Sequence, residues 1–97
     1  MKTTLKYGFA NAHIKDSTSV LSIKADIPNQ NFTVVYKSSP TTKYVYRFDA
    51  TASFLFGLSL MSSMDSAGKF AQEIKKSSDN VWKVTEGNNI GILIESK

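Results

Sequence analysis

The chain has 97 residues, of which 41% are hydrophobic and 11% aromatic. This composition is typical of one folded domain spanning residues 1–97. Its formal net charge of +4, from twelve Lys and Arg against eight Asp and Glu, favours anionic partners. The absence of cysteine excludes disulfide bonds and thiolate metal sites. Because neither a signal peptide nor an apolar span is evident, we expect a cytoplasmic protein without membrane association.

The first half of the chain predicts strands. Residues 2–9 form a candidate strand, and a polar stretch from 11 to 19 follows it. Apolar and polar residues alternate from 20 to 27, which is the pattern of a half-buried strand. Aromatic and β-branched residues alternate with others from 32 to 37 and again from 43 to 48, with a Pro-containing turn between them. These two segments predict a hairpin, and the three strands predict an antiparallel meander.

The period then changes to that of a helix. Asp49 can cap a helix at its N-terminus. The apolar residues of this helix recur at helical spacing: Phe54, Leu55, Leu58 and Met61. Phe56 and Leu60 widen the apolar surface, so we expect most of this helix to be buried. A second helix is expected from Asp65 or Ser66 to about Lys76, with Ser66 as its cap.

A second hairpin is expected at the end of the chain, from 81 to 86 and from 90 to 95 around a Gly-Asn-Asn turn. The expected fold is therefore α+β: an antiparallel sheet of about five strands with two helices packed on one face, in the order β-β-β-α-α-β-β. Trp82 could be an exposed anchor for a partner, since Trp is enriched in interface hot spots, but its alternation with Val84 indicates instead that the indole covers the core.

The order of features from 20 to 76 resembles the KTSC domain, a short family found at the C-terminus of some lysyl-tRNA synthetases and as stand-alone bacterial and phage proteins. Tyr44-Val45-Tyr46 matches the family's Tyr-x-Tyr motif, and Asp26-Ile27-Pro28-Asn29 resembles its acidic-Pro turn. Residues 66–70, SAGKF, are similar to the Ser-x-Gly-x-aromatic opening of its last helix. The resemblance implies RNA binding, which is suggested by the synthetase context.

The chain departs from this family in two respects. Ala71 and Gln72 stand where the family tends to have an aromatic residue and Asn. The N-terminal segment and the hairpin at 81–95 lie outside the family's extent, so the KTSC-like core covers about residues 20–76.

Tyr44 and Tyr46 point to the same side of their predicted strand. Both rings can form a platform on which unpaired bases stack. The alternative is that both rings pack under the helices with their hydroxyls at the rim. Because Phe32, Val34 and Phe48 share a phase with them, we favour the core.

The other side of the hairpin predicts a basic stripe of Lys37, Lys43 and Arg47, which Lys24 extends from the neighbouring strand. These side chains can neutralise phosphates, and Arg can bind one phosphate through two hydrogen bonds. The alternative is the solvated outer face that any half-buried sheet has.

Catalytic patterns are poorly supported. Ser66 and Lys69 match the S-x-x-K motif of serine acyl-enzymes, but the partner motifs of those enzymes are missing. His13 is the single histidine, and the carboxylates are scattered. We therefore expect no enzymatic activity, no cofactor and no metal.

The sequence favours a small, basic, non-catalytic module that binds RNA or single-stranded nucleic acid. Lys24, Lys37, Lys43 and Arg47 would contact phosphates, while Tyr44 and Tyr46 would stack on bases or stiffen the platform. The alternative is a phage-type accessory protein that binds a host protein, for which the hairpin at 81–95 could add a strand to the partner's sheet.

Overall fold

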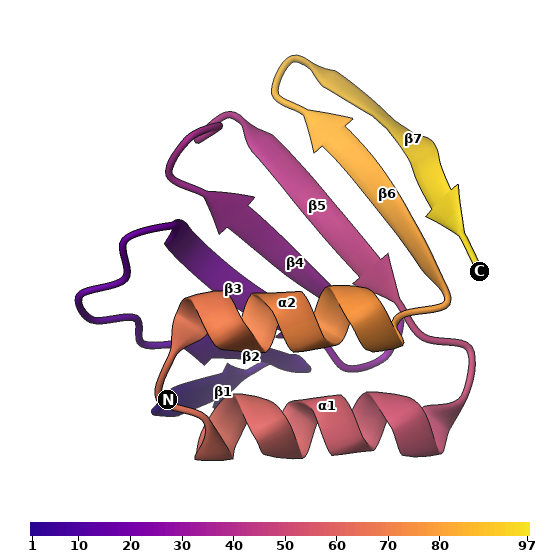
Figure 1. Cartoon of the computed structure of the whole chain (residues 1–97). Coiled ribbons are helices and arrows are strands. Elements are labelled where there is room, and N and C mark those ends of the chain that lie inside the picture. The colour runs from indigo at the N-terminus through magenta and orange to yellow at the C-terminus, as the bar shows by residue number, and fades with distance from the viewer.

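The computed structural model describes residues 1–97, apart from the side chain of Asn89. Seven strands and two helices follow one another along the chain: β1 (Thr3–Lys6), β2 (Phe9–Ala12), β3 (Val20–Asp26), β4 (Asn31–Tyr36), β5 (Thr42–Arg47), α1 (Thr51–Ser63), α2 (Ala67–Ser77), β6 (Asn80–Thr85) and β7 (Asn88–Ser96). The strands form one antiparallel sheet in sequence order, from β1 at one edge to β7 at the other (Figure 1).

The predicted fold is wrong in the number and order of its strands, because the sheet has seven strands in the order β-β-β-β-β-α-α-β-β. The two additional strands are β1 and β2, within a region expected to contain one candidate strand and a polar stretch. They form a hairpin whose turn is Tyr7-Gly8, with φ angles of 51° and 82°. Ala10 pairs with Ala25, so this hairpin extends the sheet beyond β3.

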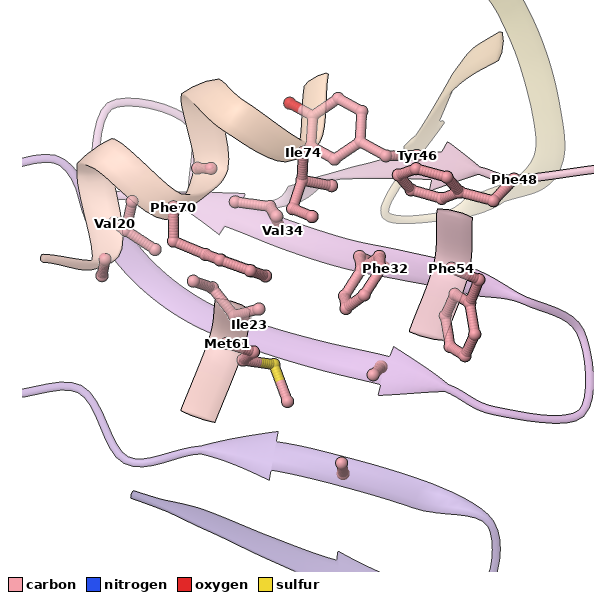
Figure 2. Close-up of a cluster of buried hydrophobic side chains, with 14 of the residues drawn as sticks. Val20, Ile23, Phe32, Val34, Tyr46, Phe48, Phe54, Met61, Phe70 and Ile74 are labelled. Carbon is pink, nitrogen blue, oxygen red and sulfur yellow. The ribbon is translucent and has the colours of Figure 1, made fainter. Parts of the chain in front are cut away.

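Both helices lie side by side across one face of the sheet (Figure 1). Side chains from the helices and from the middle strands meet in the core between these two layers (Figure 2). The largest fully buried side chains include five aromatic residues: Phe32, Tyr46, Phe48, Phe54 and Phe70. We call this side of the sheet the covered face, and the opposite side the open face.

Phe32 lies at the centre of the core. The centroid of its ring is 5.0 Å from that of Phe54, and 5.7 Å from those of both Phe48 and Phe70. The pairs with Phe48 and Phe70 are edge-to-face, a favoured geometry for aromatic rings. Phe32 on β4 therefore contacts both helices and the residue that directly follows β5 through its ring.

The observed N-terminal caps of the two helices agree only in part with the caps predicted from the sequence. Ser66 caps α2, and its hydroxyl accepts a hydrogen bond of 3.2 Å from the backbone N–H of Lys69, as predicted. The predicted cap of α1 by Asp49 is wrong, because the N-cap is Ala50, without a side-chain hydrogen bond. The backbone N–H of Asp49 instead donates to the Asp79 carboxylate at 2.8 Å.

The expectation that most of α1 is buried is also wrong. Phe54, Gly57 and Met61 are buried on its inner side. Leu55 and Phe56 are 52% and 66% exposed, respectively. This helix is apolar on nearly all sides, so helical periodicity does not identify its inner face.

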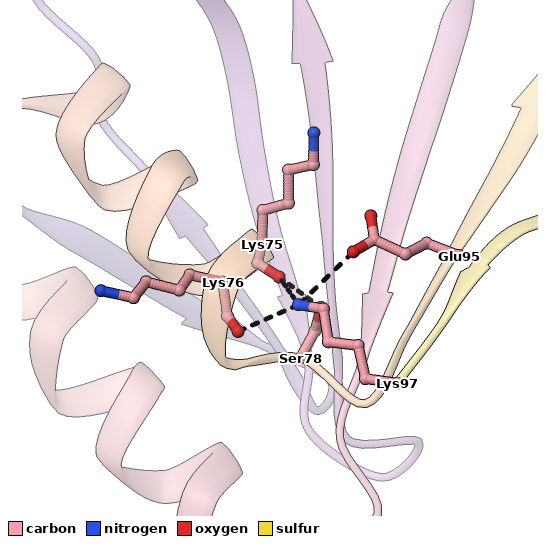
Figure 3. A network of polar contacts seen from close by, with 5 residues as sticks. All are labelled: Lys75, Lys76, Ser78, Glu95 and Lys97. Carbon is pink, nitrogen blue, oxygen red and sulfur yellow. Dashed lines mark hydrogen bonds and ion pairs between the residues drawn. The ribbon is translucent and has the colours of Figure 1, made fainter.

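Lys97 links the last strand to the end of α2 (Figure 3). Its ammonium donates hydrogen bonds to the backbone carbonyls of Lys75 and Lys76, the second at 2.9 Å. Both carbonyls belong to the last turn of α2, where the helix dipole favours a cation. Glu95 lies 4.0 Å from the same ammonium.

Candidate functional site

The open face of the sheet is defined by the pairing of its strands, because residues opposite each other in an antiparallel pair point to the same side. One row crosses six strands through successive pairs: Asn11, Lys24, Thr33, Val45, Trp82 and Leu93. A second row runs beside it: Phe9, Asp26, Asn31, Arg47 and Asn80. Both rows point away from the helices, since the alternating residues Phe32, Val34 and Tyr46 are in the core.

Three of the predicted basic residues share the open face. Lys24 and Arg47 belong to the two rows, and Lys43 pairs with Val84 on the same side of the sheet. Lys43 and Arg47 are exposed, and Lys24 is half-buried because its ammonium lies 4.8 Å from the centroid of the Phe9 ring. The structure therefore brings together three cations from two strands.

Lys37 lies apart from the other basic residues. It follows the last residue of β4, and its backbone N–H donates to the carbonyl of Ser19 at 2.8 Å. Its ammonium donates to the carbonyl of Ser17. The charge is thus held at the loop before β3, and not over the middle of the open face.

Tyr44 and Tyr46 lie on the covered face, opposite the cations with which they were predicted to act. Tyr46 is 1% exposed, and its hydroxyl shares a hydrogen bond of 2.7 Å with that of Tyr36. Tyr44 is half-buried, with its ring edge-to-face against Tyr36 at 5.5 Å. Neither ring is available to a ligand on the open face.

Two aromatic residues lie on the open face near the cations: Phe9, whose ring is next to Lys24, and Trp82, which the sequence assigned to the core. Its indole N–H donates to the side-chain oxygen of Asn80 at 2.9 Å, and Trp82 pairs with Val45 and Leu93 on the open face. The assignment is wrong because β6 turns its more apolar side away from the helices, while Val81 and Lys83 point toward the covered face.

A hollow of about 360 Å³ opens beside Trp82. It is lined by Asn29, Asn31, Val45, Arg47, Trp82, Val84 and Gly91. A Cβ atom on Gly91 would lie 3.4 Å from Cε3 of Trp82 and 3.5 Å from a methyl of Val84, so the missing side chain leaves this space open. Apolar walls with amides and a guanidinium suit a planar base attached to a phosphate.

A second hollow, of about 220 Å³, lies toward β2 and β3 on the same face. It is lined by Asn11, Ala12, Ser22, Ile23, Lys24, Thr33, Val35 and Lys43. Two cations, Lys24 and Lys43, thus line one hollow, and Arg47 lines the other. The cross-strand pair of Thr33 and Val45 lies between them.

The charges of the open face are poorly neutralised within the protein. Among the described residues, Lys97 and Glu95 form the only ion pair. Asp26 is the one acidic residue of the two rows, and its carboxylate accepts hydrogen bonds from the backbone and side-chain amides of Asn29, at 3.2 and 2.9 Å. The three cations therefore remain available to an anionic ligand.

Other kinds of site find little support. Within the part of the chain that the structure describes, no three His, Asp or Glu side chains are grouped closely enough to hold a metal ion. In the same residues, no helix combines the length and hydrophobicity needed to cross a membrane. Comparison with protein-family models, with curated proteins and with solved structures finds no match, so the resemblance to the KTSC domain stays a prediction.

Proposed function

We propose that this protein is a small, non-catalytic module that binds single-stranded nucleic acid, RNA first of all, on the open face of its sheet. The observation that carries the proposal is the placement of Lys24, Lys43, Arg47 and Trp82 on the face that no helix covers, where Arg47 and Trp82 line one hollow and the two lysines line the other. Cations neutralise phosphates, and aromatic rings stack on unpaired bases of any sequence. The resemblance to the KTSC domain supports the same ligand class.

Each part of the open face has a separate role in this proposal. Lys24 and Lys43, which line one hollow, contact backbone phosphates. Arg47 contacts a further phosphate, while a base enters the hollow beside Trp82. Tyr44 and Tyr46 stiffen the sheet from the covered face, because their rings pack with Tyr36 and the core.

The test is fluorescence anisotropy with labelled single-stranded RNA, single-stranded DNA and duplex at several salt concentrations. We expect saturable binding to single strands, with a log–log salt slope of about −2 for three phosphate contacts. Replacing all three cations by Lys24→Gln, Lys43→Gln and Arg47→Gln should weaken binding about tenfold or more at low salt.

The matched control removes three cations from elsewhere: Lys15→Gln, Lys69→Gln and Lys76→Gln. These residues are exposed and lie on the loop before β3 and on α2. Both triple variants have the same net charge, so only a local site weakens one more than the other. Equal losses in the two variants, or no binding at low salt, would contradict the proposal.

A second candidate function, binding of a host protein as a phage-type accessory protein, has one specific observation in its favour. The edge strand β7 exposes four aliphatic side chains: Ile90, Ile92, Leu93 and Ile94. Exposed apolar patches are found at protein–protein interaction sites. If this function is correct, charged substitutions on β7 will abolish partner binding, and substitutions on the open face will not.

A further inference from the structure

The β7 edge of the sheet is unusual for an edge strand. It has nine residues, and β6 is its one neighbour in the sheet. Ile90 is 75% exposed, Ile92 57%, Ile94 50% and Leu93 46%. Natural sheets usually protect an edge with Lys, with Pro, with β-bulges or by making the strand very short. From Asn88 to Ile94 this long strand has neither Lys nor Pro, and its pairing with β6 is irregular at two points.

The opposite edge of the same sheet is protected. β1 has four residues and includes Lys6 at one end, and Lys2 precedes it. Pairing of β7 with β1 of another copy would match nine residues against four, and it would repeat into an open fibre. Pairing of β7 with β7 of a second copy joins strands of equal length, and the assembly is complete with two copies.

We infer that β7 pairs antiparallel with β7 of a second copy of this chain, and that the protein forms a two-fold symmetric dimer with one continuous sheet. This inference does not depend on the proposed nucleic-acid function. Its basis is an edge strand with exposed aliphatic side chains. Two copies of this strand can pair antiparallel without placing like charges opposite each other.

The charges of β7 fit this arrangement. The strand is uncharged from Asn88 to Ile94, and Glu95 lies near its C-terminal end. When two such strands pair antiparallel around Ile92, each Glu95 stands opposite the uncharged start of the other strand. Like charges therefore do not oppose each other at the seam, where they would be unfavourable. The open-face cations Lys24, Lys43 and Arg47 lie on β3 and β5, away from this edge.

Pairing of two β7 strands also extends both faces of the sheet. On the open face Leu93 lies beside Trp82, and on the covered side Ile94 and Glu95 line a hollow with Tyr44 and Val81. A second copy would cover the exposed aliphatic side chains from the edge. The two hollows beside Trp82 would then lie on the same face of the dimer, on either side of the two-fold axis.

The test is sedimentation equilibrium of the full chain over a range of concentrations. We expect the mass to rise from 10.7 kDa toward twice this value. The double variant Ile92→Lys with Ile94→Lys should weaken association about tenfold or more, because the added lysines of the two copies meet at the seam. The control, Leu55→Lys with Phe56→Lys, adds the same charge to exposed residues of α1 and should still dimerise.

A disulfide scan tests the direction of pairing, since the chain contains no cysteine. Single variants Ile90→Cys, Ile92→Cys and Ile94→Cys are oxidised, with Thr4→Cys on β1 as the control. Near the two-fold axis a residue approaches its own copy closely enough to form a disulfide. One β7 position should therefore cross-link much faster than Thr4→Cys.

Three results would overturn the inference. They are a monomer at every concentration, a dimer that α1 lysines disrupt and β7 lysines do not, and cross-linking through Thr4→Cys as fast as through β7. If the first result is obtained and β7 of the monomer binds a different protein, the second candidate function is supported.

Discussion

The hydroxyl groups of Tyr36 and Tyr46 share a hydrogen bond of 2.7 Å between neighbouring strands on the covered face. Tyr46 is almost fully buried, while Tyr36 is half-buried. Tyr36 and Lys75 both line a hollow on this face. Burial of the Tyr46 phenol raises its pKa above the ordinary value, and the hydrogen bond to Tyr36 raises it further. The motif Tyr44-Val45-Tyr46 therefore has a structural role, which can be measured.

We expect the free energy of unfolding to fall above about pH 10, partly because of Tyr46. Below the unfolded pKa of about 10, both states keep the proton, and the contribution of Tyr46 to stability is fully present. Above it the unfolded chain loses the proton while the folded state keeps it. Stability then falls by about 1.4 kcal/mol per pH unit until the folded pKa is reached. Urea unfolding between pH 8 and 11 measures this slope.

The variant Tyr46→Phe separates this effect from the titration of lysines, which begins in the same range. It should be less stable than the original protein at pH 8, and its stability should decrease less steeply above pH 10. Tyr7→Phe is the control, because Tyr7 is exposed and should leave the slope unchanged. Identical slopes in Tyr46→Phe and the original protein would show that the phenol does not keep its proton.

Phe54 and Phe56 offer a matched pair on one helix. Phe54 is buried against the rings of Phe32 and Phe48, and Phe56 faces away from the core. Phe54→Ala should cost about 3–5 kcal/mol, and Phe56→Ala should change stability by less than about 0.5 kcal/mol. Urea unfolding of both variants measures the difference. Similar costs would mean that α1 is rotated about its axis relative to this structure.

Gly57 allows α1 to approach the sheet and α2 closely. A Cβ atom at this position would lie 2.9 Å from Cδ1 of Ile74 and 3.1 Å from the ring of Phe32. Replacing Gly by Ala in a helix normally stabilises it by about 1 kcal/mol. Overpacking a core costs about 1–3 kcal/mol, so Gly57→Ala should be destabilising by roughly 1 kcal/mol. Ser59→Ala, exposed on the same helix, should be neutral or slightly stabilising, and a stabilised Gly57→Ala variant would contradict the close approach.

Part of the fold was predictable because strong local patterns agree with the tertiary structure. Alternation from 32 to 48 predicts the hairpin, and β4 and β5 pair there through Phe32 with Tyr46 and Val34 with Tyr44. The hairpin of β1 and β2 was missed because its strands have four residues each. Its turn also places Tyr7 at positive φ, a conformation that is uncommon for a residue with a side chain.

The candidate site was predictable only in part, for a different reason. Alternation shows which side chains share a face, but it does not show which face the helices cover. On β5 the aromatic phase is clear, so Lys43 and Arg47 were assigned to the outer side, where they lie. On β6 the phase of Trp82 and Val84 is more apolar than that of Val81 and Lys83, yet it faces outward. Trp82 was therefore missed, because its neighbours across the sheet decide its position.

Two contributions to the proposed binding, base stacking in the hollow beside Trp82 and phosphate contacts, can be measured separately. Gly91→Val should fill this space, because its Cβ would lie at ordinary contact distances from Trp82 and Val84. A base would then be excluded, while no phosphate contact is removed. Stacking of one base is worth about 1–3 kcal/mol, so affinity for single-stranded RNA should fall about fivefold or more while the salt slope stays near that of the original protein. Arg47→Gln should instead reduce the magnitude of the slope by about 0.7.

Anisotropy titrations of both variants at several salt concentrations measure affinity and slope together. Gly68→Ala, on α2 at a distance from the open face, is the control for replacing a glycine, since a Cβ there meets only the hydroxyl of Ser19 at 3.1 Å. If Gly91→Val binds as tightly as the original protein, no base occupies the hollow. If it changes the salt slope as Arg47→Gln does, the added side chain displaces a phosphate, and the separate roles of Trp82 and Arg47 are wrong.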